Sequence, residues 1–378
     1  MAHLVALDLP GGPHFVRGLT EAWEAGHAVA PLDRRLARPA RERLLEALRP
    51  AGVVTVDGWE PRPGGLDVEP GDALVVATSG STGEPKGAVL THAAVAASAR
   101  ATTARLGVDP DRHRWLACLP LNHVGGLSVV TRALLTGTPL DVMDGFDPTR
   151  VSAAAGPEVL VSLVAAALAR VDGAGFRTIL LGGAAPPSEL PANVVTTYGM
   201  TETGSGVVYD GLPLDGAEVS LSARSEVLLR GPMLLRAYRD GTVPLDAEGW
   251  FRTGDGGYFD GDGRLHVHGR LSDLIITGGE NVWPEPVERI LRQHRSVGDV
   301  AVSSRSDPEW GERVLACVVP APHEAPPQLE ELRALVRDHL AGYAAPRELI
   351  LVPVLPRTSN GKLQRDVLRR RISPPEDH

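Results

Sequence analysis

The sequence TSGSTGEPKG at residues 78–87 decides how the rest of this chain is interpreted. It follows the apolar run Ala73–Ala77, which reads as a buried strand, and we expect a helix after it. Glycines let the backbone turn so that several N–H groups point to one centre, while hydroxyl side chains add donors and Lys86 adds a cation. This combination suits a polyphosphate. The stretch differs from a Walker phosphate loop, because Pro85 stands where that motif has a glycine.

Strand and helix patterns alternate on both sides of this loop. An Arg/Ala-rich helical pattern covers residues 38–48, and from Asp72 to about Val195 we expect further strands at 114–119, 139–143 and 178–181, with helices at 92–106, 126–135 and 158–170. This order predicts a layered α/β domain with a largely parallel sheet. Short alternating runs over 205–270 add an antiparallel β part. After Arg270, expected helices at 285–294 and 329–340 and strands at 300–303 and 314–319 predict a small α+β domain.

Length and charge limit the possible functions. A chain of 378 residues exceeds one compact core, so we expect domains at 1–271 and 272–378. The net charge of −9, without a run of five like charges, makes nucleic acid and anionic membranes poor partners. The longest apolar run, 159–169, is about half a membrane span, and the N-terminus lacks signal-peptide features, so we expect a cytoplasmic protein without membrane insertion. Cys118 and Cys317 lie in apolar stretches and are interpreted as buried thiols.

Lysine is rare in this chain. Of 38 basic residues only Lys86 and Lys362 are lysines, and the others are arginines. Such a bias replaces lysine wherever arginine serves, so a remaining lysine is a candidate for work that needs a compact ammonium on a flexible stem. Both lysines lie in glycine-containing loops rich in hydroxyl groups. We therefore interpret both as functional.

A second motif, YGMTET at residues 198–203, places a carboxylate between two hydroxyl side chains. Oxygen donors of this kind suit a hard cation shared with phosphate oxygens. Taken with the first motif, it predicts a site for a polyphosphate with a bound cation.

Residues 78–87 closely resemble the phosphate loop of the adenylate-forming superfamily, which comprises acyl-CoA synthetases, adenylation domains of peptide synthetases and luciferases. The other signatures follow in the family's order: YGMTET at 198–203, TGD at 253–255, GRLSDLIITGGEN at 269–281 and PRTSNGKLQR at 356–365. The resemblance implies an enzyme that uses ATP, Mg²⁺ and a carboxylic acid to form an acyl-adenylate, and then coenzyme A to form a thioester.

The resemblance also implies roles for particular residues. Thr201 would bond the α-phosphate, Glu202 would hold Mg²⁺, and Lys362 would stabilise charge between the acid and the α-phosphate. His123 would bond or gate the acid, in a pocket with Gly125, Gly126 and Leu127. The implied ATP- or AMP-binding residues are Thr78, Ser79, Gly80, Ser81, Thr82, Gly83, Lys86, Gly182, Gly183, Ala184, Tyr198, Gly199, Met200, Asp255 and Arg270.

The same resemblance places a hinge at Ser272, where relatives usually carry Asp or Lys, so this chain departs from the pattern. A hinge needs only tolerant dihedral angles and a solvated side chain, which serine satisfies. Residues 273–378 would rotate about Ser272 after adenylation. That rotation would withdraw Lys362 and bring Gly278 and Gly279 close to the pantetheine arm of coenzyme A.

Only about 77 residues precede the phosphate loop, and this short front together with VWPEPVE at 282–288 is similar to short actinobacterial 2-succinylbenzoate–CoA ligases of menaquinone synthesis. A second carboxylate on the acid calls for an arginine or several donors. Arg132 and Arg177 are candidates that we leave out of the site. The alternatives are a ligase for another aryl or acyl acid, an adenylation enzyme that loads a carrier protein, and a non-catalytic nucleotide-binding protein. The sequence leaves the oligomeric state open and allows a homodimer.

Overall fold

The computed structural model describes residues 2–79, 85–187, 189–357 and 363–372. Contacts divide the chain into two compact units. Unit 1 comprises residues 1–220, 228–252 and 261–265, and unit 2 comprises 221–227, 253–260 and 266–378. The short helix η2 (Leu271–Asp273), where we expect the domain boundary, lies inside unit 2, whose contacts extend back along the two strands before it. The hinge at Ser272 stays a prediction.

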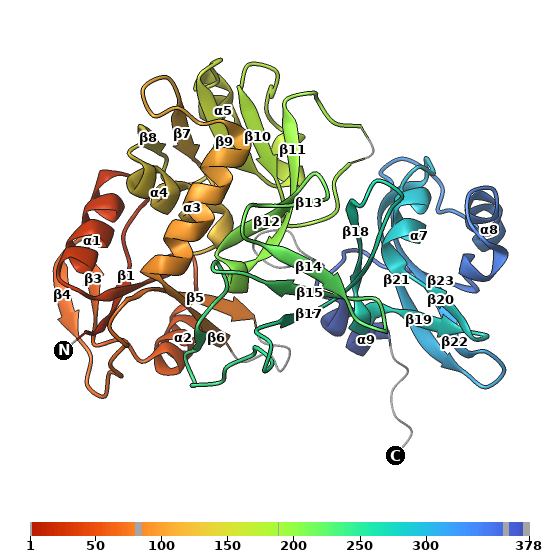
Figure 1. The fold of residues 1–378 in the computed structure, drawn as a ribbon. Helices are drawn as coiled ribbons and strands as arrows, with labels where there is room; N and C mark the ends of the chain where they lie inside the picture. Colours follow the sequence, from red (N-terminus) through yellow and green to blue (C-terminus); the bar gives the residue numbers. More distant parts are fainter. Residues whose placement is uncertain (1, 80–84, 188, 358–362, 373–378) are drawn as a thin grey trace. The chain divides into compact units, whose positions relative to one another are not determined.

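Unit 1 contains two seven-stranded sheets (Figure 1). The first is mixed: β2, β1 and β3 pair in parallel, β5 joins β2 in parallel, and β6, β16 and β4 pair antiparallel with their neighbours. Its order is β16 (Ala237–Tyr238), β6 (Pro85–Thr91), β5 (Asp72–Ser79), β2 (Ala28–Pro31), β1 (Leu4–Leu7), β3 (Gly52–Thr55) and β4 (Gly58–Pro61).

The second sheet is the largely parallel one that the sequence predicts. Its order is β13 (Leu212–Pro213), β12 (Ser205–Tyr209), β11 (Val194–Met200), β10 (Thr178–Leu181), β9 (Val159–Leu163), β7 (Arg114–Ala117) and β8 (Leu140–Val142). The strands from β11 to β8 are parallel, whereas β12 and β13 are antiparallel, which confirms the expected antiparallel β part. A third sheet with residues in both units has the order β14 (Glu218–Leu221), β15 (Glu226–Arg230), β17 (Phe251–Phe259) and β18 (Leu265–Arg270).

Helices cover these sheets. α3 (His92–Leu106) packs on β5 and β6, α4 (Val124–Thr136) packs on β7, β8 and β9, and the two helices pack on each other (Figure 1). Leu44, Leu45 and Leu48 of α2 (Arg38–Leu48) complete the core of the first sheet. The other helices of unit 1 are α1 (Pro13–Glu24), α5 (Pro148–Ala153) and α6 (Ala165–Leu168), and η1 (Thr201–Thr203) is a 3₁₀ turn.

Unit 2 is built on two long antiparallel strands, β21 (Val297–Asp307) and β22 (Gly311–Pro320). Alternate residues face opposite sides: Val300 and Val302 face the core shared with α7 (Pro284–Leu291) and α8 (Leu329–Arg337), while Ala301 and Cys317 face α9 (Arg365–Ile372). The remaining elements are β19 (Ile275–Thr277), β20 (Glu280–Val282), β23 (Glu348–Leu351) and η3 (Gly342–Ala344).

Both cysteines are buried free thiols, as predicted, and burial raises the pKa of Cys118 to about 12 and that of Cys317 to about 11. Among the described residues, none of the helices has the length and apolar character needed to traverse a bilayer.

Two local predictions are wrong. Residues 158–170 do not form one helix: Val159–Leu163 is the strand β9, and only Ala165–Leu168 is helical. An apolar run of this length does not distinguish a buried strand from a buried helix, and here β7 and β10 on both sides supply the hydrogen bonds of a strand. The phosphate loop is also not followed directly by a helix, because β6 intervenes before α3 and pairs back on β5.

The start of α4 provides a test of this packing. A Cβ on Gly126 would lie 2.5 Å from the carbonyl oxygens of both Leu119 and Pro120, whereas a Cβ on the neighbouring Gly125 would lie 3.6 Å from Leu119 Cδ1. We expect Gly126→Ala to lower the free energy of unfolding by about 2 kcal/mol, because backbone atoms must move. Gly125→Ala should leave it unchanged or slightly higher. Urea denaturation of both variants measures this, and equal stability of the two would contradict the packing described.

Candidate functional site

The reversal between β5 and β6 places Lys86 in register with Thr78. The Thr78 hydroxyl lies 3.5 Å from the carbonyl oxygen of Lys86, so the two ends of the predicted phosphate loop are held together. The structure does not describe the side chain of Ser79 or the loop residues Gly80, Ser81, Thr82 and Gly83. Their phosphate-binding role stays a prediction.

The second motif forms the end of β11 and the turn η1. A Cβ on Gly199 would lie 2.2 Å from the Ser205 carbonyl oxygen, so only glycine fits where β12 returns. The Thr203 hydroxyl donates to backbone carbonyls at Met200 and Ser205, and Thr203 Oγ1 also accepts from the Met200 N–H. This buried hydroxyl fixes the turn that carries Thr201 and Glu202.

A residue that the sequence analysis missed joins these two motifs. The Tyr238 hydroxyl donates to Glu202 Oε1 over 2.9 Å, and Lys86 Nζ lies 5.3 Å from the centroid of the Tyr238 ring. Tyr238 is 36 residues from Glu202 in the sequence, and no local motif marks it. Within unit 1, therefore, the structure brings Lys86 and Glu202 to the same tyrosine.

The predicted adenine-lining residues lie beside Tyr198. Gly182, Gly183 and Ala184 follow the carboxyl end of β10, next to the parallel strand β11 that carries Tyr198. A Cβ on Gly182 would lie 2.6 Å from Thr197 Oγ1. The absence of a side chain thus lets this segment approach β11 closely.

The predicted acid-pocket residues begin α4. His123 precedes the helix, Gly125 is exposed, and Gly126 and Leu127 are buried. Burial lowers the pKa of His123, opposed by the nearby Asp33, and His123 Nε2 is buried without a hydrogen-bond partner among the described residues. At neutral pH this imidazole is therefore uncharged.

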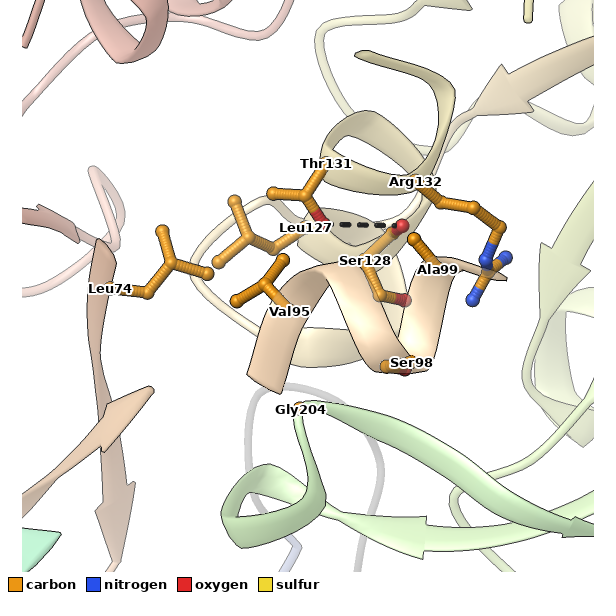
Figure 2. Close-up of a pocket in the computed structure, with 9 residues that line it drawn as sticks. All are labelled: Leu74, Val95, Ser98, Ala99, Leu127, Ser128, Thr131, Arg132 and Gly204. Carbon is orange, nitrogen blue, oxygen red and sulfur yellow. Dashed lines mark hydrogen bonds between the residues drawn. The ribbon is translucent and has the colours of Figure 1, made fainter. Parts of the chain in front are cut away.

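Leu127 also lines a narrow pocket between α3, α4 and the glycine turn after η1 (Figure 2). Arg132 is part of this lining, and the residue is 1% exposed. Nη2 donates to Ser205 Oγ over 3.1 Å, and the group stacks on Trp115 at 4.7 Å. Nε and Nη1 have no hydrogen-bond partner, and no carboxylate in the described part of the chain pairs with the group. Burial lowers the pKa of this guanidinium.

Arg177, the other arginine considered from the sequence, is different. It is exposed, and Nη2 lies 3.4 Å from the carbonyl oxygens of Leu106 and Gly107 at the end of α3. Its environment is that of a surface side chain. Of these two arginines, Arg132 is the one that combines burial, a pocket and donors without partners.

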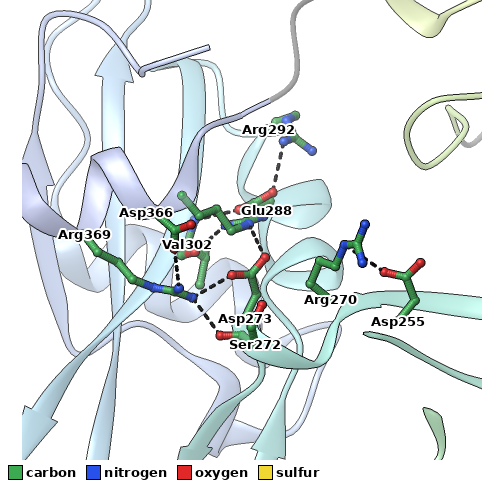
Figure 3. Close-up of polar contacts among 10 residues, drawn as sticks. Asp255, Arg270, Ser272, Asp273, Glu288, Arg292, Val302, Asp366 and Arg369 are labelled. Carbon is green, nitrogen blue, oxygen red and sulfur yellow. Dashed lines mark hydrogen bonds and ion pairs between the residues drawn. The ribbon is translucent and has the colours of Figure 1, made fainter. Parts of the chain in front are cut away.

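In unit 2, Asp255 and Arg270 contact each other (Figure 3). Arg270 Nε lies 3.1 Å from Asp255 Oδ1, and its Nη1 donates to the Thr253 carbonyl oxygen over 2.7 Å. Asp255 is buried and its N–H donates to Thr253 Oγ1. Two of the residues that the family resemblance implies in ATP or AMP binding are thus neighbours, and the arginine orients the carboxylate.

The predicted hinge is tied to the last helix. Arg369 on α9 donates to the Ser272 carbonyl oxygen and to Asp273 Oδ1, over 3.2 and 2.7 Å (Figure 3). Arg365, at the start of α9, lies 3.4 Å from Asp273 and 2.7 Å from the buried Glu288, and donates to the Val302 carbonyl oxygen. Lys362, three positions before Arg365, lies outside the described residues. The chain that follows Lys362 is therefore anchored to the residues around Ser272.

Gly278 and Gly279 form the turn between β19 and β20. Both have positive φ, 61° and 83°, in a two-residue reversal with Thr277 opposite Glu280. Such turns favour glycine at both positions. A Cβ on Gly278 would also lie 2.7 Å from the Trp310 ring. The turn therefore accounts for these glycines, and their proximity to coenzyme A stays a prediction.

Comparison with known proteins identifies matches along most of the chain. Residues 62–228 match the family model described as AMP-binding enzyme, and residues 286–362 match the AMP-binding enzyme C-terminal domain. The chain is 39% identical to a probable 2-succinylbenzoate–CoA ligase of Mycobacterium tuberculosis, over 92% of this chain and 98% of that one. It is 35% identical to a 2-succinylbenzoate–CoA ligase of Listeria monocytogenes, over 80% and 70%.

Among solved structures, an o-succinylbenzoate CoA synthetase from Bacillus subtilis, in complex with its acyl-adenylate intermediate, is similar with a TM-score of 0.85. The identity is 27%, and the match covers 97% of this chain and 88% of that one. This agreement confirms the predicted fold class.

The anchoring of α9 makes a prediction about stability. Arg365 and Arg292 both pair with Glu288, at 2.7 and 3.3 Å, but the side chain of Arg365 is 18% exposed and that of Arg292 is 46% exposed. We expect Arg365→Met to lower the free energy of unfolding by about 3 kcal/mol, because it leaves buried carboxylates poorly matched. Arg292→Met should cost under about 1 kcal/mol. Thermal and urea denaturation of both variants test this, and comparable losses would show that α9 is not anchored through Arg365.

Proposed function

Because this chain belongs to the AMP-binding enzyme family, we propose that it is an ATP-dependent ligase that converts 2-succinylbenzoate and coenzyme A to 2-succinylbenzoyl-CoA. In the first step a carboxylate oxygen of the acid attacks the α-phosphorus of ATP. The bond from that phosphorus to the bridging oxygen breaks, and pyrophosphate leaves. In the second step the sulfur of coenzyme A, having lost its proton, attacks the acyl carbonyl, and AMP leaves.

Unit 1 supplies groups suited to the first step. Lys86 follows the loop that we assign to the phosphates, and its ammonium would bind phosphate oxygens. The Thr201 hydroxyl, on the turn fixed by Thr203, would bond the α-phosphate. Tyr198 and residues 182–184, which belong to or follow the neighbouring central strands β11 and β10, would hold the adenine.

Glu202 has the donor chemistry that Mg²⁺ prefers. No group of three or more His, Cys, Asp or Glu side chains forms a metal cage in the described part of the chain. Mg²⁺ with nucleotides is usually held by one or two carboxylates, phosphate oxygens and water. Glu202, beside the hydroxyls of Thr201 and Thr203, fits that pattern. When bound, the ion would neutralise charge on the phosphates.

The motif around Lys362 supports assigning the ammonium to the charge that develops at the α-phosphate. We further propose that unit 2 residues after Ser272 move between the two steps. The contacts of Arg369 and Arg365 with the segment around Ser272 support this, since α9 and that segment would move as one body. Asp255 would bind the ribose hydroxyls, because its buried carboxylate is already oriented.

The buried environment of Arg132 supports 2-succinylbenzoate as the acid. 2-Succinylbenzoate has two carboxylates, of which one is activated and the other stays ionised. A buried guanidinium with unmatched donors at Nε and Nη1 is costly in itself, and a carboxylate is the group that would match it. Leu127 of the predicted acid pocket and Gly204, two residues after Glu202, line the same pocket as Arg132. The pocket has about 10 Å³ of free volume, room for one water, so the second carboxylate of the acid would pair with Arg132 through a bridging water or after the lining side chains move.

The proposed reaction is tested by pyrophosphate release with purified protein, MgATP and a panel of carboxylic acids. We expect 2-succinylbenzoate to trigger release, and coenzyme A to yield the thioester, identified by mass spectrometry. Release only with monocarboxylic benzoates would replace the proposed acid by another. Release without thioester formation would point to a different acceptor, such as a carrier protein. Nucleotide binding without release for any acid would indicate a non-catalytic protein.

Arg132 and Arg177 form a matched pair for the second carboxylate. We expect Arg132→Met to raise the KM for 2-succinylbenzoate at least about 100-fold, because the carboxylate loses a buried charged partner. The Tm of the unliganded variant should not fall, since an apolar side chain replaces an unmatched buried charge. Arg177→Met, at the surface, should leave the KM unchanged. An unchanged KM in Arg132→Met would exclude this arginine from acid recognition.

A further inference from the structure

Tyr238 and Ala237 form the two-residue strand β16. Tyr238 contacts two residues of the proposed metal–nucleotide site, Glu202 and Lys86. β16 lies at the edge of the first sheet, with Tyr238 in register with Ala88 of β6. The phenol hydroxyl donates to Glu202 Oε1 over 2.9 Å, and the ammonium of Lys86 lies 5.3 Å from the ring centroid. One side chain therefore contacts a carboxylate through its hydroxyl and an ammonium through its ring.

The position of this tyrosine is fixed by its neighbours. Arg236 forms a two-point ion pair with Asp72, with both N–O distances 2.9 Å, and Asp72 is 3% exposed. On the other side, the Arg239 guanidinium donates to backbone carbonyls, among them those of Leu48 and Asp67. Two residues of strand alone would not hold a side chain firmly, because they form few ladder bonds. These two arginines clamp the strand from both ends.

The same segment is bonded to the turn that carries Glu202. The N–H of Leu235 donates to the Glu202 carbonyl oxygen over 2.7 Å. Glu202 is thus held to this segment at its backbone by Leu235 and at its carboxylate by Tyr238. The orientation of that carboxylate is set by the chain itself, before any ligand is present.

The chemistry of a phenol suits this position. A lysine and a glutamate that serve the same nucleotide would neutralise each other if they paired directly. The Tyr238 hydroxyl is a neutral donor, so it orients the carboxylate without cancelling its charge. The ring attracts the ammonium more weakly than a carboxylate would. Over the residues described, no acidic side chain forms an ion pair with Lys86 within 4 Å, although the pKa of Asp240, lowered mainly by hydrogen bonds, is lowered further by the Lys86 charge from a longer distance.

We propose that Tyr238 is a positioning residue that orients the Glu202 carboxylate toward Mg²⁺ and keeps it from pairing with Lys86. This inference rests on the proposed function, because it takes Glu202 and Lys86 to serve MgATP. Tyr238 acts through these two residues and forms no bond to the reacting atoms.

The test separates the hydroxyl from the ring. Tyr238→Phe keeps the ring beside Lys86 and removes the donor to Glu202, so the Mg²⁺ concentration for half-maximal pyrophosphate release should rise at least about tenfold. Tyr238→Leu removes both contacts, so the affinity for ATP itself should also fall. Tyr258→Phe is the matched control: this exposed tyrosine stacks on His266 and His268 in unit 2, and its variant should keep the wild-type Mg²⁺ dependence.

A second measurement does not depend on the acid. Calorimetric titration of MgATP into each variant, without any acid, should show the same tenfold weakening in Tyr238→Phe. If the wild-type protein binds MgATP but releases no pyrophosphate with 2-succinylbenzoate, the proposed substrate fails while the binding data still judge Tyr238. Wild-type Mg²⁺ dependence in Tyr238→Phe would overturn the inference, as would a wild-type protein that does not bind MgATP.

A double-mutant cycle distinguishes positioning from a general structural effect. If the hydroxyl acts through the carboxylate, Tyr238→Phe should have little further effect on Mg²⁺ dependence in a Glu202→Gln background. Fully additive losses, or a fall in Tm that accounts for the loss in binding, would assign Tyr238 to stability alone.

Discussion

The hydrogen-bonded reversal between β5 and β6 is the constraint on which the site in unit 1 depends. It places Thr78 opposite Lys86, and β6 in turn pairs with the short strand that carries Tyr238. The segment before Tyr238 is bonded to the backbone at Glu202. A single antiparallel ladder at the edge of the first sheet therefore sets the separation between an ammonium, a phenol and a carboxylate that come from three distant parts of the sequence.

Arginines in the interior of this chain differ in whether their guanidinium nitrogens have hydrogen-bond partners. Arg236, Arg239 and Arg365 are half-buried and bonded to carboxylates or backbone carbonyls, so they stabilise particular connections in the fold. Arg132 is buried more completely, yet two of its nitrogens lack partners. Our proposal that Arg132 binds the second carboxylate of the acid rests on this difference, because the free-energy cost of burying the guanidinium is already included in the folded state before a ligand binds.

In unit 2 the polar network around Glu288 links elements that are far apart in sequence. Arg365, three positions after Lys362 in the sequence, contacts both Glu288 on α7 and Asp273 next to Ser272. These ion pairs hold α9 and the segment at Ser272 together. The rotation that we propose at that segment would therefore carry α9 with it.

The layered α/β class, the helices α2, α3, α4, α7 and α8, the buried thiols and the order of the family motifs could be predicted from the sequence, since these follow from local periodicity and from short, specific residue patterns. Local patterns did not reveal α1, α5 and α9, or the short strands β1 to β4. The sequence did not determine whether residues 159–163 form a strand, because that depended on hydrogen bonds from β7 and β10. It also did not separate Arg132 from Arg177, or mark Tyr238 at all. Burial and contact between residues far apart in the chain are properties of the packed structure, and only tertiary folding decides them.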